Sequence, residues 1–168
     1  DIPVFVFSIA DPMVPPSLTL TCVSLMKPTL IIGPLSWRVM RGTVTWNGEG
    51  YDGSTESGKR FSIYDKNSPS PMEMVLHAHA TCSLIDVIGG LKDRRERIRE
   101  ARVEIESERA SDSPRVFEKI HFRYVIRGGV PEALINRIIH QSHEKLCSVG
   151  IMLTRGGVDL SWELDFKN

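Results

Sequence analysis

The sequence predicts an α+β fold. From Met40 onward, the expected order is three strands, a helix, two strands, a second helix and a last strand. Three observations carry this prediction: a hairpin turn at Asn47-Gly48, a complete helix start at Ser70-Pro71, and alternating apolar residues across 115–126. Strands gathered in groups between helices indicate α+β rather than a doubly wound parallel sheet.

The first group of strands predicts a three-stranded meander. Residues 43–46 are rich in strand-forming side chains and meet the Asn47-Gly48 turn. Residues 51–57 return as the second strand, and Ser57-Gly58 makes the next turn. Residues 60–64 alternate as a third strand should, before the chain breaks ahead of the helix.

A helix is expected to begin after Ser70. Ser70 is a capping residue, Pro71 occupies the first helical position, and Glu73 follows three residues after Ser70, which makes a capping box. Residues 72–88 are apolar nearly all round, and a helix of that kind is expected to be buried on every side. Gly89-Gly90 is expected to end it.

The second half of the chain predicts two long strands, a helix and a last strand. The two strands cover 101–108 and 115–126, with a turn between them. The helix opens at Pro131 and runs to about Leu146, and 147–153 make a short further turn. The last strand covers 158–166.

Residues 1–39 differ from the rest of the chain. They hold four of the 42 charged residues (21 basic and 21 acidic) but six of the ten prolines. A transmembrane helix needs about 20 apolar residues without such breaks, and a secretory signal needs a basic start. The first cation here is Lys27. We therefore expect 1–39 to be a poorly structured leader outside one domain, 40–168.

Composition limits the classes of partner. Basic and acidic residues balance at 21 each, which argues against nucleic acid or an anionic membrane as a partner recognised by bulk charge. Three cysteines are too few for a secreted disulfide scaffold, and their odd number would leave one unpaired. We therefore expect a protein of a reducing compartment, the cytoplasm.

Two cysteines are candidates for chemistry. Cys82 lies about three turns into the first helix, too far for the helix N-terminus to stabilise a thiolate. Its support must come from neighbours such as His79 at i−3 or Asp86 at i+4. Cys147 can stand at the start of a short final helix, where free N–H groups favour a thiolate. The plain alternative for both is a small buried core side chain.

A metal site is a competing hypothesis. His79 and Cys82 share a helix face, as do His140, His143 and Cys147. Zinc accepts such ligands, but these spacings match no standard zinc finger. The sequence therefore predicts neither a metal nor another cofactor.

Five segments of the sequence share one resemblance. They are 68–76 (Ser-Pro-Ser-Pro-Met-Glu-Met-Val-Leu), 82–88, 106–109, 114–117 and 144–153 (Glu-Lys-Leu-Cys-Ser-Val-Gly-Ile-Met-Leu). In this order and at these distances they resemble the OsmC/Ohr family of osmotically inducible and organic hydroperoxide resistance proteins. The likeness is closest to the YhfA-like branch of that family and covers about residues 40–166.

The resemblance implies an intertwined homodimer. Each subunit would give a three-stranded meander, two central helices and a second strand set, and the active sites would lie at the dimer interface. In the peroxidase members of this stress-response family, the cysteine that matches Cys82 attacks the peroxide and becomes a sulfenic acid. The cysteine that matches Cys147 then forms a disulfide with it, which a dithiol such as a lipoyl group reduces.

This chain departs from the peroxidases in the charged partners of the thiolate. Those enzymes carry a glutamate directly after the proline that opens the helix, whereas this chain has Met72 there and Glu73 one place later. They also use an arginine from the N-terminal strands. The possible supports of the reactive thiolate in this chain are Arg60, Glu73, His79 and Glu144.

Two functions of different classes follow. The first is a thiol peroxidase, an oxidoreductase that reduces organic or hydrogen peroxide through a Cys82 sulfenic acid and a Cys82–Cys147 disulfide. The alternative is a non-catalytic domain on the same scaffold that binds a hydrophobic ligand or senses redox state. The peroxidase requires the two sulfurs to meet in one pocket, with Cα atoms about 4.4–6.8 Å apart or able to approach to that distance.

Overall fold

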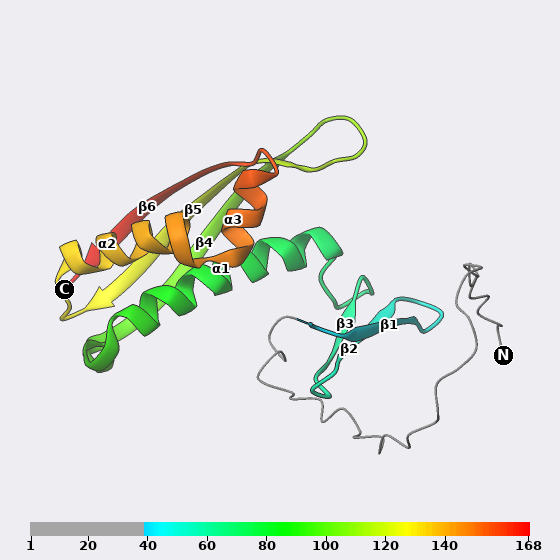
Figure 1. The fold of residues 1–168 in the computed structure, drawn as a ribbon, viewed down its shortest axis with the longest axis horizontal. Helices are drawn as coiled ribbons and strands as arrows, with labels where there is room; N and C mark the ends of the chain where they lie inside the picture. The colour runs from blue at the N-terminus through cyan, green and yellow to red at the C-terminus, as the bar shows by residue number, and fades with distance from the viewer. Residues whose placement is uncertain (1–38) are drawn as a thin grey trace, which may run out of the picture. The chain divides into compact units, whose positions relative to one another are not determined.

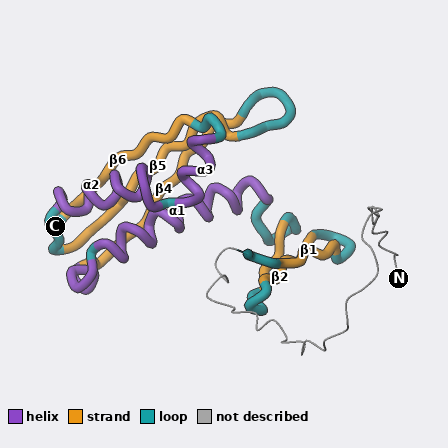
Figure 2. The backbone as a smooth tube through the Cα atoms, viewed as in Figure 1, coloured by secondary structure: helices purple, strands orange, loops and turns teal. Residues whose placement is uncertain are grey.

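The computed structural model describes residues 39–168, and contacts join Arg41–Asn168 into one unit. The predicted leader, 1–39, lies outside the described residues except for its last position. Within the described part, a three-stranded antiparallel sheet comes first, and helices and a second, mixed sheet follow (Figures 1 and 2). The α+β fold class predicted from the sequence is confirmed.

The first sheet is the predicted meander. It consists of β1 (Gly42–Trp46), β2 (Tyr51–Thr55) and β3 (Arg60–Ile63), each antiparallel to the next. The Asn47 side chain holds the first turn, because its Oδ1 accepts hydrogen bonds from the backbone N–H of Glu49 (3.1 Å) and of Gly50 (2.8 Å). This short polar side chain therefore fixes the hairpin register locally.

The first helix, α1 (Pro71–Gly90), begins as predicted. The Ser70 hydroxyl accepts a hydrogen bond from Glu73 N at 3.3 Å, and Ser70 N donates to Glu73 Oε2 at 2.8 Å, which completes the capping box. The glycine pair that was expected to end the helix forms its last two residues. Gly90 faces α2, where a Cβ would lie 2.9 Å from Ile138, so close helix packing accounts for a glycine there.

The second sheet has the order β4–β5–β6. β4 (Ile98–Arg109) and β5 (Phe117–Gly128) form a long antiparallel hairpin, whereas β6 (Asp159–Lys167) runs parallel to β5. Parallel neighbours require a crossover connection. Here that connection contains α2 (Glu132–Gln141) and α3 (Ser148–Arg155), so the sheet topology places these helices on one face.

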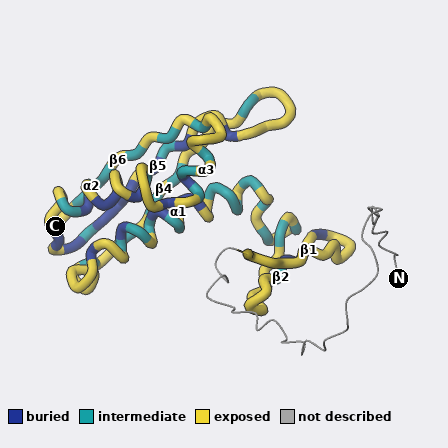
Figure 3. The backbone as a smooth tube through the Cα atoms, viewed as in Figure 1, coloured by how far each residue is buried: buried dark blue, intermediate teal, exposed yellow. Residues whose placement is uncertain are grey.

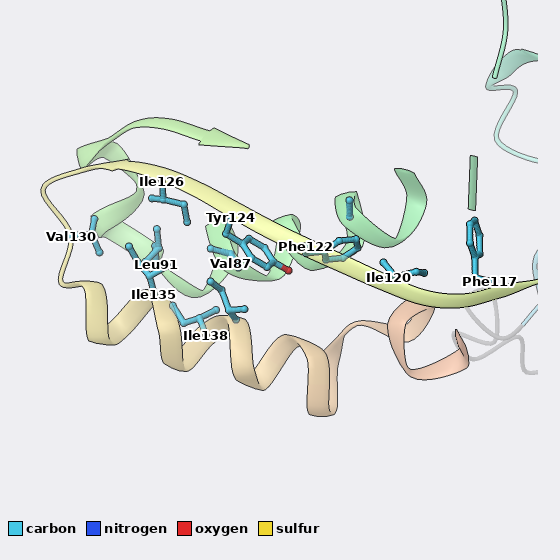
Figure 4. Close-up of a cluster of buried hydrophobic side chains, with 12 residues drawn as sticks. Val87, Leu91, Phe117, Ile120, Phe122, Tyr124, Ile126, Val130, Ile135 and Ile138 are labelled. Atoms are coloured by element: carbon cyan, nitrogen blue, oxygen red, sulfur yellow. The ribbon is translucent and has the colours of Figure 1, made fainter. Parts of the chain in front are cut away.

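The hydrophobic core lies between this sheet and the helices (Figures 1 and 4). Phe122 and Tyr124 project from β5 toward the helices, where Val87 of α1 and Ile135 of α2 also point (Figure 4). All four side chains are fully buried. The other face of the sheet is charged, as Arg123 pairs there with acidic residues of both neighbouring strands.

One prediction about the helices is wrong, and one needs a refinement. α1 was expected to be buried on every side, yet Ile85 is 65% exposed and one face of the helix is open (Figure 3). The second helix was expected to reach about Leu146, and the helical run does end there. Its α-helical part, α2, stops at Gln141, and the last turn, Ser142–Leu146, is π-helical. None of the described helices combines the length and apolar content needed to cross a bilayer.

Candidate functional site

The two predicted cysteines meet between α1 and α3. Cys82 lies in the middle of α1 and is half-buried, whereas Cys147 caps the N-terminus of α3 and is fully buried. Both are reduced. The two thiols are neighbours, because Cys82 is among the groups that raise the pKa of Cys147, after the larger effect of burial. The fold therefore joins thiols that are 65 positions apart in the sequence.

Cys147 is held as a neutral thiol. Its Sγ accepts a hydrogen bond from Gly150 N at 3.3 Å and donates to the His79 backbone carbonyl at 3.9 Å. Burial is the largest cause and raises the pKa of Cys147, the Gly150 N–H lowers it, and Cys82 and Asp86 raise it by smaller amounts. The helix start was expected to favour a thiolate here, but desolvation outweighs it.

A π-helical turn, Ser142–Leu146, places Cys147 against α1. The Cys147 N–H donates to the Ser142 carbonyl five residues earlier, at 2.8 Å. Cys147 itself has extended backbone angles and begins the next helix. A turn of this kind holds one residue more than an α-helical turn and is frequent at functional sites.

The Cys82 side chain opens into an apolar pocket of about 650 Å³. The pocket runs along the open face of α1. Its lining is completed by Pro69, Met74, His77, Ala78, Thr81 and Ile85. Cys147 is not among the lining residues, so of the two thiols Cys82 is the one that a small molecule in this pocket would meet.

His79 adjoins Cys147. Its ring packs on Phe122 with centroids 4.5 Å apart, and it is fully buried. A methyl group on Gly150 would lie 2.6 Å from His79 Nε2 and 3.4 Å from Cys147 Sγ, so ring and sulfur border the same space. Burial lowers the pKa of His79 to about 4, so the ring is neutral at pH 7 and offers no positive charge to a thiolate.

The structure does not bring the other predicted supports to the thiol pair. Glu73 is engaged in the capping box. Arg60 lies on β3 opposite Ser54, on the polar face of the meander. Glu144 is exposed and pairs with His140 at 3.3 Å. Within residues 39–168, no cation is hydrogen-bonded or ion-paired to Cys82.

A chain of hydrogen bonds beside the thiols was missed in the sequence. Asp86 Oδ2 accepts from Ser142 Oγ (2.7 Å), Ser142 Oγ bonds Ser83 Oγ (3.0 Å), and Ser83 Oγ bonds the Tyr124 hydroxyl. Tyr124 in turn bonds His143 Nε2 at 2.9 Å. Ser83 is a polar residue in a largely apolar helix. A buried serine needs a hydrogen-bond partner, so this position could have indicated the hydrogen-bond chain from the sequence.

His143 closes this chain on the sheet side. It stacks on Trp162 with centroids 6.1 Å apart, and burial lowers its pKa to about 4, with smaller contributions from His79 and His140. A zinc site was the competing hypothesis for these histidines. Among the described residues, no three or more His, Cys, Asp or Glu side chains are grouped so as to hold a metal.

The sequence profile of the OsmC-like protein family matches residues 64–163 of this chain. The chain belongs to the OsmC-like protein family. The matched region contains both cysteines and the whole hydrogen-bond chain from Asp86 to His143. The resemblance stated from the sequence is thereby confirmed.

Relatives support the same assignment. Protein YhfA of Escherichia coli (strain K12) is 37% identical over 122 residues, which cover 69% of this chain and 90% of YhfA. A hypothetical protein from Aquifex aeolicus VF5, known from its crystal structure, is 25% identical to this chain and has a TM-score of 0.66. The match covers 77% of this chain and 98% of the Aquifex chain. The organic hydroperoxide resistance protein OhrB of Bacillus subtilis shares the fold at a TM-score of 0.50 and 20% identity, covering 76% of this chain and 98% of OhrB.

Proposed function

We propose that this OsmC-like protein is a two-cysteine thiol peroxidase. The observation that supports this most is the pairing of a half-buried Cys82, which opens into a pocket, with a buried neutral Cys147 beside it. Cys82 lines the pocket and can therefore contact a peroxide that binds there. Cys147 is buried beside it and can react with Cys82 once Cys82 is oxidised.

The proposed reaction has two steps within the chain. The Cys82 thiolate attacks a peroxide oxygen, the O–O bond breaks, and an S–O bond forms as the alcohol leaves with a proton. The Cys147 sulfur then attacks the sulfenic sulfur. The S–O bond breaks, the disulfide forms, and the thiol proton leaves with the hydroxide as water. An external dithiol, of lipoyl type or another thiol, returns both cysteines to the reduced form and is itself oxidised.

The pocket favours organic peroxides as substrates. Its lining around Cys82 is mostly apolar, and an alkyl or aryl group would gain from leaving water there. A relative of the same fold is named for resistance to organic hydroperoxides. Hydrogen peroxide has no such group, so we expect it to be the poorer substrate.

We further propose that the protein acts as a homodimer. The meander exposes Val44, Trp46 and Phe61, which share one of its faces in the strand register, and Ile85 is exposed beside Cys82. A second copy would cover both surfaces with matching apolar chemistry. Arg60 projects from the other face of the meander, so we assign it no role at the thiolate.

The second candidate function is a hydrophobic-ligand-binding or redox-sensing domain. Met72 replaces the glutamate of the peroxidases, and Glu73 is committed to the helix cap. These two observations favour a site that binds in the apolar pocket without rapid peroxide turnover. In that case the thiol pair would report redox state rather than catalyse.

Thiol counting separates the two functions. The full chain is treated with one equivalent of cumene hydroperoxide, and free thiols are measured after mixing. We expect the loss of two thiols per chain. The loss is absent in Cys82→Ser and is retained in the control Cys22→Ser, because Cys22 is no part of the pair. Unchanged thiol content in the parent protein would favour the binding domain.

A further inference from the structure

Beside the thiols, the polar chain Asp86–Ser142–Ser83–Tyr124 adjoins a core cluster of this protein that is formed mainly by apolar side chains. We infer that Ser83, Tyr124 and Ser142 are positioning residues that hold Cys147 against Cys82 for disulfide closure. This inference rests on the proposed function only in that the disulfide is its second step.

The hydrogen-bonded hydroxyl groups act on each cysteine indirectly, through a residue that is adjacent or bonded to it. Ser83 directly follows Cys82 on α1. Ser142 begins the π-helical turn, and its carbonyl accepts the hydrogen bond of Cys147 N at 2.8 Å. The Ser83–Ser142 bond of 3.0 Å therefore ties the two cysteine-bearing segments together.

Tyr124 and Asp86 each bond one of the two serines, Ser83 and Ser142 respectively. The Tyr124 hydroxyl reaches Ser83 from β5, the central strand of the second sheet. Asp86 lies one turn after Cys82 on α1 and accepts from Ser142 at 2.7 Å. The π-helical turn is thus hydrogen-bonded to α1 and is linked to β5 through Ser83 and through His143.

Hydroxyl groups define a position more sharply than apolar packing does. Ser83, Tyr124 and Ser142 are fully buried, so each hydroxyl loses water and must find its partner in the protein. A displaced π-helical turn would leave these groups unpaired, and a buried unpaired hydroxyl is costly. Directional bonds therefore favour one placement of Cys147.

That placement matters for closure because a disulfide tolerates little error. The Cα atoms must lie about 4.4–6.8 Å apart, and a misplacement of about 1 Å can cost about 100-fold in reaction rate. If the π-helical turn lost these hydrogen bonds, Cys147 would occupy several positions instead of one. The effective concentration of one thiol at the other would then fall.

The test measures this effective concentration without peroxide. Full-length protein carrying Cys22→Ser is equilibrated in glutathione redox buffers, and the fraction with a Cys82–Cys147 disulfide is quantified by mass spectrometry. We expect Ser142→Ala and Tyr124→Phe each to lower the effective concentration at least about tenfold, which is about 30 mV. Ser142→Thr keeps a hydroxyl and should restore most of it.

Ile138→Val is the matched control, because it removes a buried methyl group from the same core outside the hydrogen-bond chain. It should leave the effective concentration unchanged. Equal values in the parent, Ser142→Ala and Tyr124→Phe would overturn the inference, as would a parallel fall in Ile138→Val or a parent that forms no Cys82–Cys147 disulfide. A normal glutathione response in a protein that does not consume peroxide would reject the peroxidase proposal alone.

Discussion

At the scale of single residues, two histidines near the thiols show how burial sets the charge of an imidazole ring: His79 is fully buried and His143 is partly buried. His79 stands at i−3 from Cys82 and was a candidate thiolate support, but its ring nitrogens have no hydrogen-bond partner within the described residues. His143 bonds Tyr124 through one nitrogen only. Burial lowers the pKa of both from 6.5 to about 4, so each is neutral in the folded protein at pH 7.

This burial predicts a loss of stability on acidification. Between pH 6.5 and about 4, the unfolded chain binds protons at these histidines while the folded chain does not, so stability falls as the pH falls. Each histidine adds a slope of at most about 1.4 kcal/mol per pH unit. Urea unfolding at pH 7.5, 6.5, 5.5 and 4.5 measures this slope, because the series runs from above the unperturbed pKa of 6.5 to near the folded value of about 4.

The variant His79→Leu isolates one of the two contributions, because leucine fills the site without titrating. Its unfolding free energy should fall less steeply over the same window. The carboxylates of Asp65 and Asp165 have pKa values below 3.8, so their protonation adds little above pH 5. Parallel curves for the parent and His79→Leu would show that His79 does not titrate as described.

At the scale of elements, the start of α1 shows what local sequence can specify. The capping box at Ser70 and Glu73 needs residues three apart and no distant contact, and it forms as predicted. The π-helical turn shows the opposite case. Its first residue, Ser142, is held by Ser83 and Asp86, which lie 59 and 56 positions away. Local periodicity predicted the end of the helical run at about Leu146 correctly. It did not predict the π-helical form of the last turn, where those distant contacts act.

The cap of α1 contributes stability that can be measured. Ser70→Ala removes the hydroxyl that accepts from Glu73 N, and we expect the unfolding free energy to fall by about 1 kcal/mol. Ser111→Ala, in the exposed loop between β4 and β5, is the control and should change it by less than about 0.5 kcal/mol. Equal effects of the two variants in urea unfolding would contradict a stabilising cap.

At the scale of the whole molecule, two apolar surfaces lack cover in the single chain. One face of the meander carries Val44 and Trp46, which are 64% and 68% exposed, and the open face of α1 carries Ile85. The sequence predicted a helix buried all round. That prediction fails within one chain and would hold in the proposed dimer.

The dimer proposal can be tested on β1 alone. Trp46→Glu places a charge on the apolar face of the strand, and we expect the dimer to dissociate at micromolar concentration because an unpaired charge would be buried. Thr45→Glu introduces the same charge on the opposite face, because side chains alternate along a strand. We expect this variant protein to remain dimeric. Light scattering after gel filtration gives the mass. A monomeric parent protein, or dissociation by both variants alike, would count against the proposed interface.

The sequence by itself determined the α+β class, the meander, the capped helix and the two cysteines, because each depends on residue type and short-range spacing. The tertiary structure decided that the two cysteines adjoin, that Cys147 is neutral, and that a buried hydrogen-bond chain lies beside the two cysteines. It also turned His79 toward Cys147 and left one face of α1 open. These features depend on desolvation and on contacts between segments about 40 to 60 positions apart, which no local pattern encodes.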